Sequence, residues 1–180
     1  APLVPRGLRY EIKERIGPNG TVLVALSESA VTEALTDLVC RGIGAVAVCF
    51  LNSPVNSVHE QTVARIAAEK FPQLFVSTST EVFPFLREYE RWTTATMNAY
   101  TGPLFDQYLR RLEDGLREAG LEGDLFIMSS SGGTVAPDVA RRFPVRMLES
   151  GPAAGVLQTA ALGRQLKRPN LLSFDMGGTT

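Results

Sequence analysis

The pattern of apolar and polar positions changes twice near the start of the chain. Residues 8–15 alternate apolar and charged side chains, which predicts a half-buried strand. The turn-forming residues 17–20 and a short apolar run over 21–26 follow, so the two runs are expected to pair as a hairpin. A proline-rich stretch precedes them. Residues 1–26 are therefore predicted to form a linker and an N-terminal hairpin.

Residues 27–80 contain apolar positions at helical spacing, separated by short apolar runs of strand length. Strands that alternate with helices in this order indicate a βαβ unit, whose strands lie parallel. The predicted elements are a helix from Ser27 or Ser29 to Cys40, a strand over 45–51, a helix over 57–70 and a strand over 74–77.

Residues 81–180 are predicted to be a helical segment followed by the start of a further α/β lobe. Its first helix carries a strong apolar stripe, and its last strand leads into a glycine loop at the carboxyl end. The predicted elements are a helix over 88–120 interrupted at 101–103, a strand over 125–129, helices over 138–142 and 153–166, and a strand over 171–174.

Composition describes an ordinary folded chain. Of its 180 residues 44% are hydrophobic, and it contains 18 basic and 19 acidic side chains. The aromatic content argues against disorder, and a net charge of -1 gives no general attraction to nucleic acid or anionic membranes. No apolar run approaches the roughly 18 residues of a membrane-spanning helix. We therefore expect neither a nucleic-acid nor a membrane partner.

Cysteine and histidine are scarce. Cys40 and Cys49 lie outside any metal-binding spacing, which favours buried, inert thiols in a reducing cytoplasm. His59 is the single histidine, so a zinc site built on several histidines is excluded within these residues. Its position near a predicted helix start favours a surface location.

The glycine loop at the carboxyl end is the first candidate for chemistry. Asp175 follows a predicted strand, and Gly177, Gly178, Thr179 and Thr180 come next. Paired glycines let backbone amides approach a phosphate, threonines add hydroxyl donors, and an aspartate at the end of a strand is suited to Mg²⁺. The spacing and lysine of a P-loop are absent. The loop taken alone leaves phosphate binding and a plain strand turn as alternatives.

The helix before this loop is unusually rich in small residues, which permit close approach of a neighbouring element. They are explained either by tight core packing or by a crossing at a hinge between two lobes. The small residues are Ala153, Ala154, Gly155, Ala160, Ala161 and Gly163.

A polar but largely uncharged stripe marks the predicted helix after residue 87. Glu90, Thr94, Asn98 and Thr101 are at helical spacing and would share one face. Such a stripe is usually a solvated face. Hydroxyl and amide groups beside Trp92 also fit the wall of a cleft.

Taken together, these features resemble the hydantoinase A/5-oxoprolinase family of N-methylhydantoinase-like, ATP-dependent hydrolases. The resemblance extends from about Pro2 to Thr180. It rests on five ordered motifs: 88–91 with Thr93 and Thr94, 98–100, 130–133, 149–156 and 175–179.

The resemblance implies a partial actin-like ATPase (ribonuclease H-like) fold, an α/β architecture with a mixed sheet and flanking helices. Within it, the terminal loop corresponds to the second phosphate motif, and the chain is an internal piece of a longer protein. The implied activity is ATP-dependent opening of a cyclic amide such as a hydantoin or 5-oxoproline. Two alternatives stay open: an ATP-dependent ketone carboxylase subunit and a non-enzymatic actin- or chaperone-like ATPase.

The same resemblance assigns roles to residues. ATP and Mg²⁺ are the implied cofactors, and the implied partners are a cyclic amide or ketone substrate and a second, hydantoinase B-type subunit. An ATP site split between two lobes predicts that these 180 residues are inactive in isolation. The implied roles are catalysis for Asp175 and Glu90, metal binding for Asp175, phosphate binding for Gly177, Gly178, Thr179 and Thr180, and a substrate cleft for Thr94, Asn98, Ser131, Gly132 and Gly133.

Overall fold

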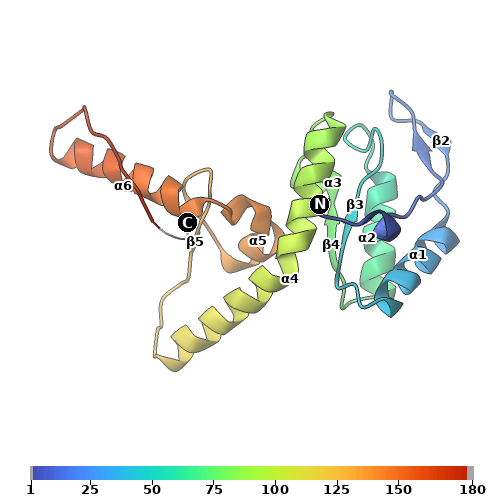
Figure 1. Cartoon of the computed structure of the whole chain (residues 1–180), viewed down its shortest axis with the longest axis horizontal. Helices are drawn as coiled ribbons and strands as arrows, with labels where there is room; N and C mark the ends of the chain where they lie inside the picture. The colour runs from blue at the N-terminus through green and yellow to red at the C-terminus, as the bar shows by residue number, and fades with distance from the viewer. Residues whose placement is uncertain (1, 178–180) are drawn as a thin grey trace. The chain divides into compact units, whose positions relative to one another are not determined.

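The chain folds into two compact units, Ala1–Pro103 and Leu104–Thr180. The computed structural model describes residues 2–177, coloured in Figure 1 from blue to red along the chain. One helix, α4 (Glu88–Glu118), runs from the first unit into the second. Each unit has its own buried apolar cluster.

The first unit is built around a parallel pair of strands with helices packed against it. Val31, Leu35 and Ile66 are almost completely buried in the apolar cluster between these elements. Helices α1 and α2 lie side by side (Figure 1). The elements are η1 (Arg6–Leu8), β1 (Arg15–Ile16), β2 (Val22–Val24), α1 (Glu28–Cys40), β3 (Ala45–Val48), α2 (Val58–Lys70), β4 (Phe75–Thr78), α3 (Ser79–Val82) and the first part of α4.

The parallel pairing predicted from the alternation of strands and helices is confirmed. β3 and β4 run parallel, with Ala45 opposite Phe75 and Val48 opposite Thr78. The hydroxyl of Ser27 accepts a hydrogen bond from the amide of Ala30 at 3.3 Å, so Ser27 is the cap of α1. The carboxyl ends of β3 and β4 therefore lie at the same edge of the sheet.

The predicted strand over residues 8–15 is only partly confirmed. Ladder pairing is restricted to Arg15–Ile16, which forms the short antiparallel hairpin with β2. Residues 8–14 nevertheless keep the predicted alternation, with even-numbered side chains more buried than odd-numbered ones. Alternation reports which side chains face the core, and a strand also needs a hydrogen-bonding neighbour. Among residues 2–177 no strand pairs with 8–14.

The predicted interruption at residues 101–103 is wrong, because α4 continues through Pro103. A proline inside a helix costs on the order of 3 kcal/mol. Packing on both sides offsets this cost: Ala95 and Ala99 are buried before the proline, and Leu109 is buried after it. Tertiary contacts therefore decide the helix length.

Substituting Gly102 or Gly115 of this helix with alanine is expected to change the stability of the chain in opposite directions. A Cβ at Gly102 would lie 2.4 Å from the Phe75 ring, whereas one at Gly115 would meet nothing within 4 Å. We expect Gly102→Ala to destabilise the chain by about 1–3 kcal/mol through overpacking. Gly115→Ala should stabilise it by up to about 1 kcal/mol, since alanine is the better helix former. Urea unfolding of both variants tests this, and equal effects would contradict the packing at Gly102.

The second unit has a smaller core formed by Leu109, Ala140 and Met147. Arg141 joins its helices through ion pairs with Asp106 at 3.2 Å and with Glu113. The elements after α4 are β5 (Ile127–Met128), β6 (Thr134–Val135), α5 (Pro137–Arg142), η2 (Pro144–Met147) and α6 (Ser150–Gln165).

A single mixed sheet is not observed. Within residues 2–177 the strands form three separate two-stranded sheets, of which only β3–β4 is parallel. The strand predicted over 171–174 is also absent, and Leu172 and Phe174 are 91% and 80% exposed. An apolar run becomes a strand only beside a partner, and the described chain supplies none here.

The two cysteines differ. Cys40 is exposed, contrary to the expectation that it is buried. Cys49 follows β3 directly, and its pKa is raised to about 12, chiefly by burial and further by the Glu60 carboxylate, with Arg91 opposing. Cys49 is half-buried, and its raised pKa agrees with the expected inert thiol.

We expect a thiol-specific reagent at pH 8 to label Cys40 and to leave Cys49 unmodified. With a pKa of about 12, only about 10⁻⁴ of the Cys49 thiol is ionised at that pH, and the thiolate is the reactive species. Mass spectrometry of labelled peptides, with and without denaturant, tests this. Equal labelling rates of the two cysteines in the folded protein would contradict it.

Candidate functional site

The predicted loop of Ser131, Gly132 and Gly133 is the turn of the β5–β6 hairpin. Gly132 and Gly133 have φ values of 85° and 82°, a conformation that favours glycine. The Ser129 amide donates to the Gly133 carbonyl at 3.0 Å, which closes the turn. Ser130 holds the turn to η2, because its amide and hydroxyl both donate to the Arg146 carbonyl. The loop is thus a fixed feature of the second unit.

Helix α6 contacts both this hairpin and the segment that leads to Asp175. A Cβ at Gly132 would lie 3.3 Å from Leu157 of α6, and one at Gly163 would lie 3.1 Å from Leu171. Of the two explanations for the small residues, close packing therefore applies at Gly163. Gly163 is buried, whereas most of the other residues of α6 are exposed.

A groove of about 720 Å³ lies between α6 and residues 167–173. Three cationic residues, Arg164, Lys167 and Arg168, are among those that line it. The groove is therefore lined by positive charge, and Asp175 itself is not among its lining residues.

The terminal loop is described only in part. Asp175 and Gly177 are exposed, so the carboxylate of Asp175 is accessible to an ion or ligand. Gly178, Thr179 and Thr180 lie outside the described residues. The phosphate-binding role of the loop stays a prediction.

The polar stripe on α4 divides into exposed and buried members. Glu90 is exposed and pairs with Arg87 at 3.5 Å, and the Thr94 hydroxyl donates to the Glu90 carbonyl at 2.6 Å. Asn98 is 1% exposed and donates to the Ser77 hydroxyl at 3.2 Å. All three belong to the first unit, whereas the hairpin loop and Asp175 belong to the second. A cleft role for Glu90, Thr94 and Asn98 stays a prediction.

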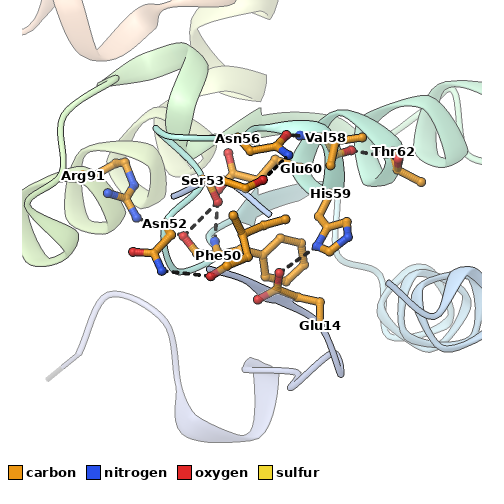
Figure 2. Close-up of polar contacts among 12 residues, drawn as sticks. Glu14, Phe50, Asn52, Ser53, Asn56, Val58, His59, Glu60, Thr62 and Arg91 are labelled. Carbon is orange, nitrogen blue, oxygen red and sulfur yellow. Dashed lines mark hydrogen bonds and ion pairs between the residues drawn. The ribbon is translucent and has the colours of Figure 1, made fainter. Parts of the chain in front are cut away.

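A buried polar network is the best-defined polar site in the first unit, and it was not predicted. Glu60 of α2 and Arg91 of α4 are both 0% exposed. The Ser79 hydroxyl lies between them, donating to Glu60 Oε1 at 2.6 Å and accepting from Arg91 Nε at 3.0 Å. Figure 2 shows Glu60 and Arg91 with the loop around Phe50 that follows β3. The network joins α2, α3 and α4 at the carboxyl edge of the parallel strands.

His59 is buried rather than exposed at the surface, so that expectation is wrong. Its Nδ1 lies 2.8 Å from Glu14 Oε2, and both side chains are less than 10% exposed. Figure 2 shows this pair beside Phe50. The extended segment carrying Glu14 folds over the start of α2, which the local sequence around His59 does not reveal.

The sequence did contain a signal for the buried network. Arg91 shares a helical stripe with Ala95, Asn98, Ala99 and Gly102, and a stripe of such small residues is typical of a packed face. A charged residue on that face requires a buried partner. The partner, Glu60, lies on the apolar face of α2, and only the fold brings the two together.

Comparison with known proteins identifies the family. The hydantoinase/oxoprolinase family model matches residues 91–180, and the model of the hydantoinase/oxoprolinase N-terminal region matches residues 1–71. The chain belongs to the hydantoinase/oxoprolinase family, as its motifs predicted. None of the helices in residues 2–177 combines the length and apolarity that crossing a membrane requires.

The relatives include enzymes with more than one chemistry. The chain is 33% identical to the caprolactamase subunit alpha of Pseudomonas jessenii, over 99% of this chain and 26% of the relative. It is 31% identical to the acetophenone carboxylase gamma subunit of Aromatoleum aromaticum, over 99% of this chain and 25% of the relative. It is 34% identical to the 5-oxoprolinase of Saccharomyces cerevisiae, over 85% of this chain and 12% of the relative.

Two solved structures share the fold of the chain. The crystal structure of the ATP-dependent caprolactamase from Pseudomonas jessenii matches with a TM-score of 0.88 at 33% identity, over 98% of this chain and 26% of that one. A nucleotide-free acetone carboxylase matches with a TM-score of 0.79 at 27% identity, over 93% of this chain and 24% of that one. The chain thus spans about a quarter of the length of these relatives.

Proposed function

We propose that the intact protein is an ATP-dependent hydrolase of cyclic amides. The observation that carries this proposal is the likeness to the ATP-dependent caprolactamase, which extends over 98% of the chain with a TM-score of 0.88. A 5-oxoprolinase among the relatives supports the same reaction class. The proposed substrates are therefore lactams or related cyclic amides.

In this proposal the fold is part of an actin-like ATPase, and the terminal loop holds the phosphates of ATP. The donor set suits such a ligand: Asp175 presents an exposed carboxylate for Mg²⁺, and Gly177 has no Cβ to obstruct a phosphate. Gly178, Thr179 and Thr180 would complete the loop. Arg164, Lys167 and Arg168 line the groove beside α6, on the chain segment that precedes the loop.

Ring opening of an unstrained amide needs help, because the amide is a poor electrophile. ATP, when bound, supplies the phosphoryl group that turns the amide oxygen into a better leaving group. The protein then has to hold the amide oxygen in line with the transferred phosphoryl group and to stabilise the charge on that group. Glu90, Thr94, Ser131, Gly132 and Gly133 are the proposed substrate contacts, with Glu90 as a candidate acid or base. Asn98 is buried, so its proposed role in the cleft is to support this face of α4 through Ser77.

The second candidate is an ATP-dependent carboxylase of ketones. The observation that favours it is the pair of carboxylase relatives, named as subunits of acetophenone and acetone carboxylases. The subunit names of these relatives and of caprolactamase also support a second polypeptide as partner. We propose that this partner is of the hydantoinase B type.

Product analysis separates the two candidates. The intact protein is incubated with its partner subunit, ATP and Mg²⁺, and with either caprolactam and 5-oxoproline or acetone and acetophenone, each with and without bicarbonate. We expect ring-opened amino acid and substrate-dependent phosphate release that does not require bicarbonate. Bicarbonate-dependent consumption of the ketone would instead support the carboxylase. ATP hydrolysis indifferent to every substrate would favour a non-enzymatic ATPase.

A further inference from the structure

The carboxyl edge of the β3–β4 pair contains an anion-binding arrangement that is already filled. In open α/β sheets this edge is where ligands bind, because the loops after parallel strands meet there. Here those loops contribute backbone amides and hydroxyls that point at one carboxylate, the side chain of Glu60.

The contacts of Glu60 are those of a bound carboxylate. Its Oε1 accepts from the Phe50 amide at 3.0 Å and from the Ser79 hydroxyl at 2.6 Å. Its Oε2 accepts from the amide and the hydroxyl of Thr80 at 3.0 and 2.8 Å. Phe50 comes from the loop after β3, and Ser79 and Thr80 come directly after β4. Each oxygen thus has one backbone and one hydroxyl donor.

Arg91 fixes the direction of these donors. Its Nε donates to the Ser79 hydroxyl, so the hydroxyl proton is directed at Glu60. Its other nitrogens donate to the carbonyls of Phe85 and Phe50 at 2.7 and 2.9 Å. The guanidinium therefore orders the loops on both sides while contacting the carboxylate only through Ser79. Figure 2 shows Arg91 on the opposite side of the Phe50 loop from the His59 pair.

We propose that the loop after β3 and the start of α3 form a preorganised site for a small carboxylate and that Glu60 is its built-in ligand. The bond pattern does not depend on the chain connection of the carboxylate, because every donor belongs to another element. Glu60 therefore closes this edge of the sheet to external anions and joins the loop after β3 to the start of α3. This inference does not rest on the proposed catalytic function.

The test is chemical rescue. In Glu60→Ala the carboxylate is removed while its four donors remain, so formate should bind in its place and stabilise the folded intact protein. We expect the Tm of this variant to rise by about 3 °C or more with formate, beyond its rise with sodium chloride at equal ionic strength. Wild type and Glu69→Ala, an exposed glutamate on the same helix, should show no such selective rise.

A second variant distinguishes filling the site from general stabilisation. Glu60→Gln keeps the space occupied, so formate should not raise its Tm selectively. If Glu60→Ala does not fold alone, recovery of its native circular dichroism on refolding in formate supports the proposal. The proposal is overturned if formate acts equally on Glu60→Ala and wild type, if it raises the Tm of Glu60→Gln as much, or if it fails to recover an unfolded Glu60→Ala.

Discussion

Substituting Asp175 with alanine in the intact protein is expected to reduce substrate-dependent ATP hydrolysis by at least about 100-fold while leaving the fold unchanged. In the proposed function its carboxylate positions Mg²⁺ beside the phosphates, and losing that charge removes stabilisation specific to phosphoryl transfer. The side chain is exposed, so its removal costs no buried contact. Phosphate release with and without the cyclic amide measures the effect.

Two controls make the Asp175 experiment specific. Asp124→Ala removes another exposed aspartate of the same unit and should leave the rate near wild type. Asp175→Asn keeps the size and removes the charge, so it should resemble Asp175→Ala. A rate near wild type in both Asp175 variants would remove this residue from the site, and an altered circular dichroism spectrum would show that it has a structural role instead.

Replacing Arg91 with methionine should lower the free energy of unfolding by about 3–5 kcal/mol, because the three hydrogen bonds that this buried guanidinium donates are lost. The substitution preserves much of the packing volume but leaves the carbonyls of Phe50 and Phe85 without these donors. It also leaves the Glu60 carboxylate buried without a nearby positive charge. Urea unfolding monitored by circular dichroism measures the loss.

The matched control is Arg87→Met on the preceding turn. The Arg87 side chain is 80% exposed and pairs with Glu90 at the surface, so its loss should change stability by less than about 0.5 kcal/mol. Combining Arg91→Met with Glu60→Gln should cost less than the sum of the single changes, because the second change removes the unpaired charge. Equal losses for Arg87→Met and Arg91→Met, or strict additivity, would contradict the buried network.

The local pattern of apolar and polar residues was sufficient to predict an element where that element depends mainly on its own residues. The periodicity of α1 and α2 and the apolar run of β3 predicted the parallel pair, because amphipathic spacing records which face is buried. Ordered motifs predicted the family, since their spacing is set by chemistry shared with relatives. The roles of Glu90, Asp175 and the other site residues stay predictions.

The same pattern gave wrong predictions where the structure of a segment depends on a packing partner distant in the sequence. Residues 8–14 alternate as a strand does but have no described neighbour to pair with, and α4 continues through Pro103 because both of its halves are packed. The spacing of Arg91 with Ala95 and Asn98 marks a packed helix face. This spacing does not reveal that Glu60, 31 positions earlier in the chain, is linked to Arg91 through the Ser79 hydroxyl.

The sequence by itself determined the family, the βαβ order and the position of the terminal glycine loop, because these follow from local spacing. Only the tertiary structure decided that His59 is buried against Glu14 and that Glu60 fills the carboxyl edge of β3–β4. The physical reason is that a buried charge is tolerated only where several chain segments meet to satisfy it. Such a meeting is a property of the fold and of no single segment.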